Sequence, residues 1–164
     1  MEGVSSQTVL CFKATGNSMW PIMKKGDWVT VIKPDKIREG DIITWFTRYN
    51  KVITHRVYWL DQHQRHFITK GDLAMAPEKV ASAERILGKV IYVKKRRFAV
   101  NVNGDLSGRW YELYFRIDKF LLRRLHRVPN RIQPVILLCR IFYLLIFIIA
   151  FILSVYESRD HKIL

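Results

Sequence analysis

Three residues of this 164-residue chain have the side chains that could together cleave a peptide bond: Ser18, His55 and Asp72. A serine hydroxyl is a poor nucleophile until a neighbouring base takes its proton, and a histidine with a pKa of about 6.5 suits that task. A carboxylate can then hold the imidazole in the required tautomer. Because any chain of this size contains such a trio, its neighbouring residues must decide whether it is significant.

The segments that must position these residues have the composition of short β-strands. They are rich in β-branched and aromatic residues, and turn residues such as Gly-Asp and Pro-Asp pairs separate them. The expected strands are residues 9–14, 28–32, 41–46, 52–60, 66–69 and 87–93. This spacing of about ten residues predicts a mainly β fold, a compact and mostly antiparallel sheet or barrel-like domain. We assign this domain to residues 1–98.

Three blocks, in this order, resemble the signal peptidase I family and, within it, the endoplasmic-reticulum-type branch. They are Ser18-Met19-Trp20-Pro21, His55-Arg56-Val57 and Thr69-Lys70-Gly71-Asp72. Lesser matches are Lys25-Gly26-Asp27, Gly40-Asp41-Ile42-Ile43 and Leu87-Gly88-Lys89-Val90. The resemblance covers roughly residues 15–93. Self-cleaving repressors are wider fold relatives with a Gly-x-Ser-Met box, but they use lysine as the base.

The resemblance implies a serine endopeptidase that cleaves signal or leader peptides. Ser18 would be the nucleophile, and His55 the general base and then the general acid. An acidic residue would orient His55, either Asp72 or Glu78, because the aspartate of this branch lies several residues beyond the Gly-Asp pair. A peptide or protein substrate would bind as an extended strand beside the domain.

The resemblance also implies an oxyanion hole formed by the Ser18 backbone N–H and the Asn17 side chain, since Gly16 stands where bacterial members carry a serine. No cofactor is expected. A metal is also not expected, because His63 and His66 have a ligand-like interval but no companion cysteine or acidic cluster.

The net charge of +14 indicates an anionic partner, and much of the excess lies in residues 94–133, with 11 basic and 3 acidic residues. Apolar residues at three- and four-residue spacing over residues 109–128 predict a helix with arginines on another face, typical of a membrane surface. A helix packed on its own domain is the alternative. We interpret residues 99–133 as a basic amphipathic membrane-surface segment. Anionic lipids are the expected partner, and the run Lys94-Lys95-Arg96-Arg97 is assigned to them rather than to nucleic acid.

Residues 134–156 have the composition of a transmembrane helix. Sixteen of these 23 residues are Leu, Ile, Val or Phe, and Arg140 is their single charged residue. At about 1.5 Å per residue such a helix spans a hydrocarbon core of about 30 Å. We therefore predict a single-pass C-terminal anchor followed by a polar tail, residues 157–164. The positive-inside rule favours a cytoplasmic β domain. Secretory signal peptides are cleaved on the opposite, non-cytoplasmic side, so the sequence does not decide on which side of the membrane the β domain lies.

The sequence does not predict the oligomeric state of the protein. It is compatible with two other functions. One is a catalytically inactive membrane scaffold that binds peptides or lipids. The other is a self-cleaving or regulatory cytoplasmic protease, as the repressor relatives suggest.

Overall fold

The computed structural model describes residues 8–61, 63, 65–74, 77–80, 83–96, 99–102 and 106–125, and helical residues 134–135, 137–139, 141–142, 144–146 and 148–149. The chain divides into two compact units, Met1–Val102 and Asn103–Leu164. The strands of the first unit continue past residue 98, where the sequence placed the end of the β domain.

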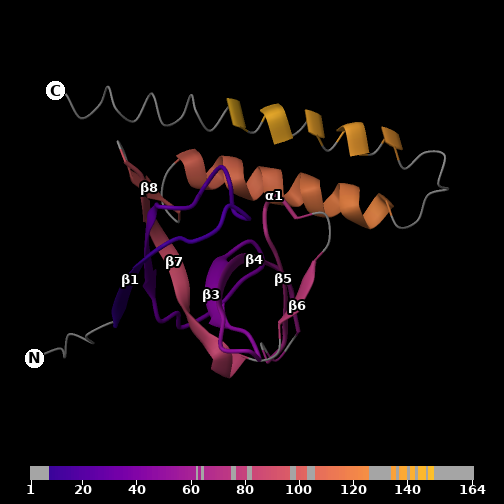
Figure 1. Ribbon diagram of the computed structural model, residues 1–164. Helices are drawn as coiled ribbons and strands as arrows, with labels where there is room; N and C mark the ends of the chain where they lie inside the picture. The colour runs from indigo at the N-terminus through magenta and orange to yellow at the C-terminus, as the bar shows by residue number, and fades with distance from the viewer. Residues whose placement is uncertain are drawn as a thin grey trace, which may run out of the picture. The chain divides into compact units, whose positions relative to one another are not determined.

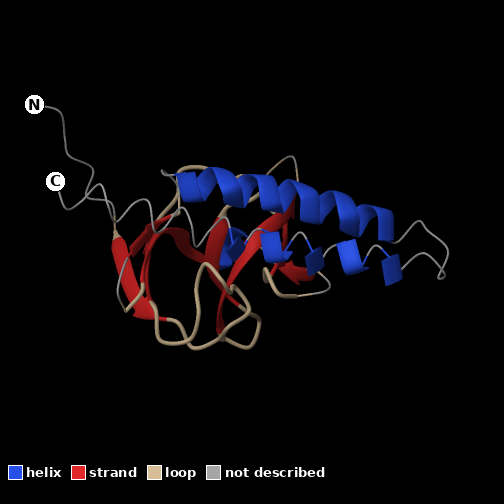
Figure 2. Ribbon diagram, turned by 90° about the horizontal axis from the view of Figure 1, so that it is seen from above, coloured by secondary structure: helices blue, strands red, loops and turns tan. Residues whose placement is uncertain are grey.

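The described part of the first unit is an antiparallel β domain (Figure 1). It also contains a short 3₁₀ helix, Ala83–Arg85. Its described strands are β1 (Val9–Lys13), β2 (Trp28–Ile32), β3 (Ile42–Phe46), β4 (Val52–Leu60), β5 (Phe67–Lys70), β6 (Glu78–Val80), β7 (Ile86–Lys94) and β8 (Ala99–Asn101). Their order in the sheet is β1-β2-β7-β3-β4-β5-β6, and β8 pairs with β7. Loops of several residues join the strands (Figure 2).

The long strand β7 joins the two halves of the sheet. Along one edge it pairs with β2, from Lys89 to Lys94. Along the other edge its first part pairs with β3 and its last part with β8. The order of the strands thus places β7 between the N-terminal hairpin β1–β2 and the hairpin β3–β4.

Apolar side chains of the central strands form the core that holds β4 in place. Ile43 of β3 and Val57 of β4 are fully buried, and Ile43 is the register partner of His55. The same cluster contains Ile37, Trp45 and Phe67. The strand that carries the candidate base is therefore held in the core through Val57 and through its pairing with β3.

The mainly β prediction is confirmed, and the expected strands agree with β1, β2, β3, β4, β5 and β7 to within a residue at each end. The sequence did not predict β6 and β8, each of three residues. The second unit contains α1 (Leu106–Leu125), where a helix was expected over residues 109–128. Its arginines Arg116, Arg123 and Arg124 are exposed.

Within the parts of the chain that the structure describes, no helix combines the length and apolar character needed to cross a membrane. The predicted span, residues 134–156, lies in part outside the described residues, and the predicted tail, residues 157–164, lies wholly outside them. The membrane anchor stays a prediction.

Candidate active site

Ser18 and His55 lie side by side although 37 positions separate them in the chain. Ser18 lies in the loop between β1 and β2, and His55 lies within β4. The Ser18 Oγ atom is 3.1 Å from the His55 Nε2 atom, which is a hydrogen-bond distance. Ser18 is exposed, whereas His55 is 6% exposed. The hydroxyl is thus open to a substrate while the imidazole beside it is shielded from water.

The loop that carries Ser18 is closed at its base by backbone hydrogen bonds. The Ala14 N–H donates to the Asp27 carbonyl and the Gly26 N–H donates to the Ala14 carbonyl, both at 2.8 Å. Gly26 has a φ of 94°, in the left-handed region that favours glycine. Met19 and Ile22 are almost fully buried, so they anchor the far part of the loop. These contacts hold the backbone of the loop on both sides of Ser18.

The side chain of Asn17, predicted to contribute to the oxyanion hole, takes part in the structure of this loop. Its Oδ1 atom accepts a hydrogen bond from the Lys25 backbone N–H at 2.9 Å. The Asn17 carbonyl also accepts from the Trp20 N–H at 3.0 Å. The bond from Lys25 orients the side-chain amide of Asn17. The contributions of the Asn17 side chain and of the Ser18 N–H to an oxyanion hole stay predictions.

Gly71 lies against both members of the pair. A β-carbon added at Gly71 would lie 3.0 Å from the Ser18 Cβ atom and 3.3 Å from the His55 Nε2 atom. The next residues continue this contact, since the Leu73 N–H donates to the Ser18 carbonyl at 3.0 Å. Gly71 is part of the Thr69-Lys70-Gly71-Asp72 motif, but its place beside Ser18 and His55 was not predicted. A close approach of this kind has no sequence signal beyond the glycine itself.

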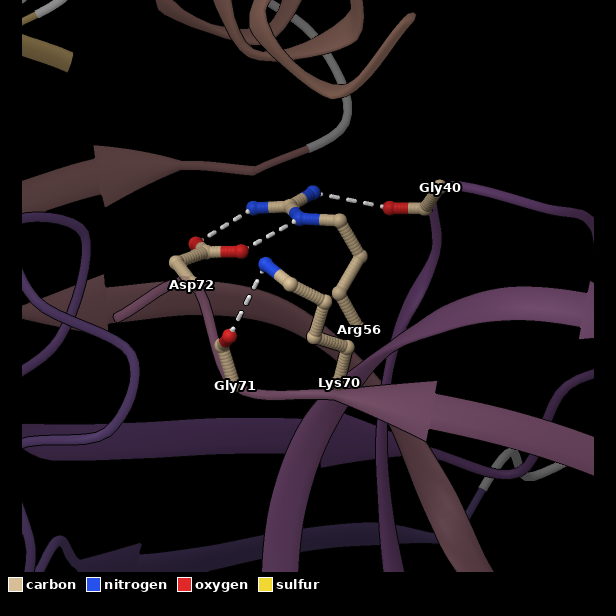
Figure 3. A network of polar contacts seen from close by, with 5 residues as sticks. All are labelled: Gly40, Arg56, Lys70, Gly71 and Asp72. Atoms are coloured by element: carbon tan, nitrogen blue, oxygen red, sulfur yellow. Dashed lines mark hydrogen bonds and ion pairs between the residues drawn. The ribbon is translucent and has the colours of Figure 1, made fainter. Parts of the chain in front are cut away.

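Asp72 is joined to Arg56 in a buried ion pair (Figure 3). The Arg56 Nε atom donates to Asp72 Oδ1 at 2.8 Å and the Arg56 Nη2 atom donates to Asp72 Oδ2 at 2.9 Å. The Arg56 Nη1 atom donates to the Gly40 carbonyl at 2.8 Å. Lys70 is buried beside them, with its Nζ atom 3.4 Å from the Gly71 carbonyl oxygen. The network ties the end of β5 to β4, next to His55.

This network gives Asp72 a structural role. The bidentate geometry uses both carboxylate oxygens. The backbone of the alternative acid, Glu78, lies in β6 opposite Thr69, and its side chain lies outside the described residues. Which of the two acids orients His55 stays a prediction.

The two histidines that were considered as metal ligands lie at the surface of the β domain. His63 and His66 are exposed, and His66 Nδ1 is 3.4 Å from Asp61 Oδ2. Among the described residues, no group of three or more His, Cys, Asp or Glu side chains could hold a metal ion.

An antiparallel β domain with a serine hydroxyl against a histidine defines the class of a serine-peptidase-type hydrolase. Residues 2–91 match the family described as Peptidase S24-like, and the chain belongs to this family. A comparison with curated proteins finds no match.

Proposed function

We propose that the chain is a membrane-anchored serine endopeptidase of signal-peptidase type that cleaves signal or leader peptides. One observation carries the proposal: the exposed Ser18 hydroxyl lies 3.1 Å from the shielded His55 Nε2 atom. This distance is within the range that general-base catalysis requires.

The proposed reaction has two halves. His55 Nε2 takes the Ser18 proton while Ser18 Oγ attacks the substrate carbonyl, and the Ser18 backbone N–H and the Asn17 side chain stabilise the oxyanion. His55 then gives the proton to the leaving amine, which departs and leaves an acyl ester on Ser18. Water then attacks this ester while His55 takes its proton, and His55 returns that proton to Ser18 Oγ as the ester bond breaks and the carboxylic acid is released.

Two features support the proposed likeness to the endoplasmic-reticulum-type branch of the signal peptidase I family. A histidine on β4 contacts the serine, where the repressor relatives use lysine as base. The three sequence blocks also meet, because Gly71 of the third block lies against both Ser18 and His55. The proposed substrate segment binds in an extended conformation, with small side chains next to the cleaved bond.

The proposed membrane association rests on two parts of the second unit. Residues 134–156 would provide the anchor, and the exposed arginines of α1 would contact anionic head groups. Anchoring would raise the local concentration of substrates held at the same surface. The distribution of charges favours a cytoplasmic domain, which suits a leader peptide processed on that side.

Labelling with a fluorophosphonate probe, followed by mass spectrometry of the full chain in detergent, tests the proposed chemistry. We expect the label on Ser18 and none in the Ser18→Ala variant. The His55→Ala variant should react at least about a hundredfold more slowly, whereas the His66→Ala control should react like the wild type. A label on another residue, or an unchanged rate in His55→Ala, would contradict the proposal.

Membership of the Peptidase S24-like family favours a second candidate function, self-cleavage. Incubation of the purified chain over a range of concentrations distinguishes the two functions. Intramolecular cleavage follows first-order kinetics with a rate constant that does not depend on protein concentration. An endopeptidase acting on other chains cleaves an added leader peptide, and Ser18→Ala abolishes either reaction.

A further inference from the structure

Lys95 reaches into the loop that carries Ser18. It directly follows β7, and its Nζ atom is 2.9 Å from Asp27 Oδ2 and 3.1 Å from the Pro21 carbonyl oxygen. The side chains of Lys95 and Asp27 are 10% and 5% exposed. The neighbouring residues Lys94 and Arg96 are exposed. The whole run Lys94-Lys95-Arg96-Arg97 was expected to contact lipid head groups. In the structure the Lys95 side chain is instead buried against the Ser18 loop.

The two acceptors of Lys95 lie at different parts of the same loop. Pro21 is three positions after Ser18, and Asp27 lies at the base of the loop. Asp27 Oδ2 also accepts a hydrogen bond from the Lys24 backbone N–H at 2.9 Å. An ammonium group has three N–H donors, so one lysine can bridge both positions. Lys95 therefore links the middle of the loop to its base from a segment about 70 positions away.

We propose that Lys95 is a positioning residue that holds the Ser18 loop closed, so that the Ser18 hydroxyl stays within hydrogen-bond distance of His55. The effect on Ser18 rests on the proposed function, whereas the closure of the loop does not. Hydrogen bonds from a charged donor are stronger than neutral ones, and burial strengthens them further. The bridge replaces water that would otherwise solvate the Pro21 carbonyl and the Asp27 carboxylate.

The bridge depends on the charge of Lys95, which gives it a pH dependence. Burial lowers the pKa of Lys95, its hydrogen bond and ion pair with Asp27 raise the pKa, and the nearby Lys24 lowers it. Because the net effect is a lowered pKa, Lys95 loses its proton at a less alkaline pH than a solvated lysine does. An arginine at this position stays protonated throughout that range.

Hydrogen–deuterium exchange of the full chain tests the closure without any need for activity. In Lys95→Met, amides of residues 17–27 should exchange about tenfold faster, as expected for loss of a charge-assisted bond. They should exchange as in the wild type in the Lys94→Met control and close to it in Lys95→Arg. Exchange in β3 and β4 should stay unchanged. Unchanged exchange in the loop, or an equal rise throughout the domain, would overturn the proposal.

The alkaline limb of Ser18 labelling tests the positioning of the nucleophile. The wild-type rate should fall as Lys95 deprotonates, whereas Lys95→Arg should keep its rate to higher pH. If the labelling rates of the wild type and of Lys95→Arg fall at the same alkaline pH, the proposed dependence of the bridge on the charge of Lys95 is overturned. If the wild type takes no label while the loop of Lys95→Met exchanges faster, the closure stands and the proposed peptidase function fails. The arginine variant keeps the test valid if Lys95→Met does not fold.

Discussion

Gly71 is so close to Ser18 that a side chain at this position would require neighbouring atoms to shift. A β-carbon at Gly71 would lie 3.0 Å from both the Cβ atom and the carbonyl oxygen of Ser18. This is closer than the ordinary van der Waals separation of carbon atoms, about 3.5–4.0 Å. The glycine thus allows the chain after β5 to pass close to Ser18.

Substitution of Gly71 by alanine should displace Ser18 by a few tenths of an ångström relative to His55. Because small displacements of reacting groups have large effects on rate, we expect fluorophosphonate labelling to slow at least about tenfold. Gly16→Ala is the matched control, since a β-carbon there would have no atom within 4 Å. Equal labelling rates in the two variants would show that the contact with Gly71 does not position the serine.

Loss of one partner of the Arg56–Asp72 pair should destabilise the β domain strongly. In Asp72→Asn the buried guanidinium loses its countercharge, so the free energy of unfolding should fall by about 3–5 kcal/mol in urea titrations followed by tryptophan fluorescence. The double variant Arg56→Met/Asp72→Leu should be less destabilised than either single variant.

The exposed pair Glu112–Arg116 of α1 provides the control for this experiment. Glu112→Gln should change the free energy of unfolding by less than about 1 kcal/mol. A comparable small effect in Asp72→Asn would contradict the structural role of the buried pair. Labelling rates of folded Asp72→Asn and Glu78→Gln would then show which acid orients His55.

Gly88 of β7 lies against Val31 and Ile32 of the neighbouring strand β2, and a side chain there should strain the sheet. An added β-carbon would lie 2.8 Å from the Ile32 carbonyl oxygen and 3.1 Å from the Val31 Cβ atom. Overpacking of this kind costs about 1–3 kcal/mol, so Gly88→Ala should lower the midpoint of thermal unfolding. An unchanged midpoint would mean that the two strands separate without cost.

Charged residues in the predicted span should weaken membrane binding of the full chain. Each lysine at the centre of a span opposes insertion by about 2.5–3.5 kcal/mol, so Leu145→Lys/Ile148→Lys should be extracted from vesicles by carbonate. The wild type should remain in the pellet. Two lysines placed in residues 157–164 provide the control, and extraction of the wild type would contradict the anchor.

The sequence predicted the strands well because each has its own local pattern of β-branched and aromatic residues between turns. The strands β6 and β8 escaped prediction because three residues are too few to show such a pattern. The convergence of Ser18 and His55 followed from the resemblance, not from spacing. The bridge from Lys95 to Asp27 could not be predicted, because it joins residues 68 positions apart and the exposed neighbours Lys94 and Arg96 are basic residues like Lys95.

The position of β7 in the sheet has a consequence for biosynthesis. The loop that carries Ser18 joins β1 to β2, and His55 lies on β4. In the sheet, β7 lies between β2 and β3. A nascent chain that ends after β4 already contains Ser18 and His55 but lacks the strand that joins their two hairpins. The sheet that brings Ser18 and His55 together is therefore completed only after β7, which ends at Lys94, has left the ribosome.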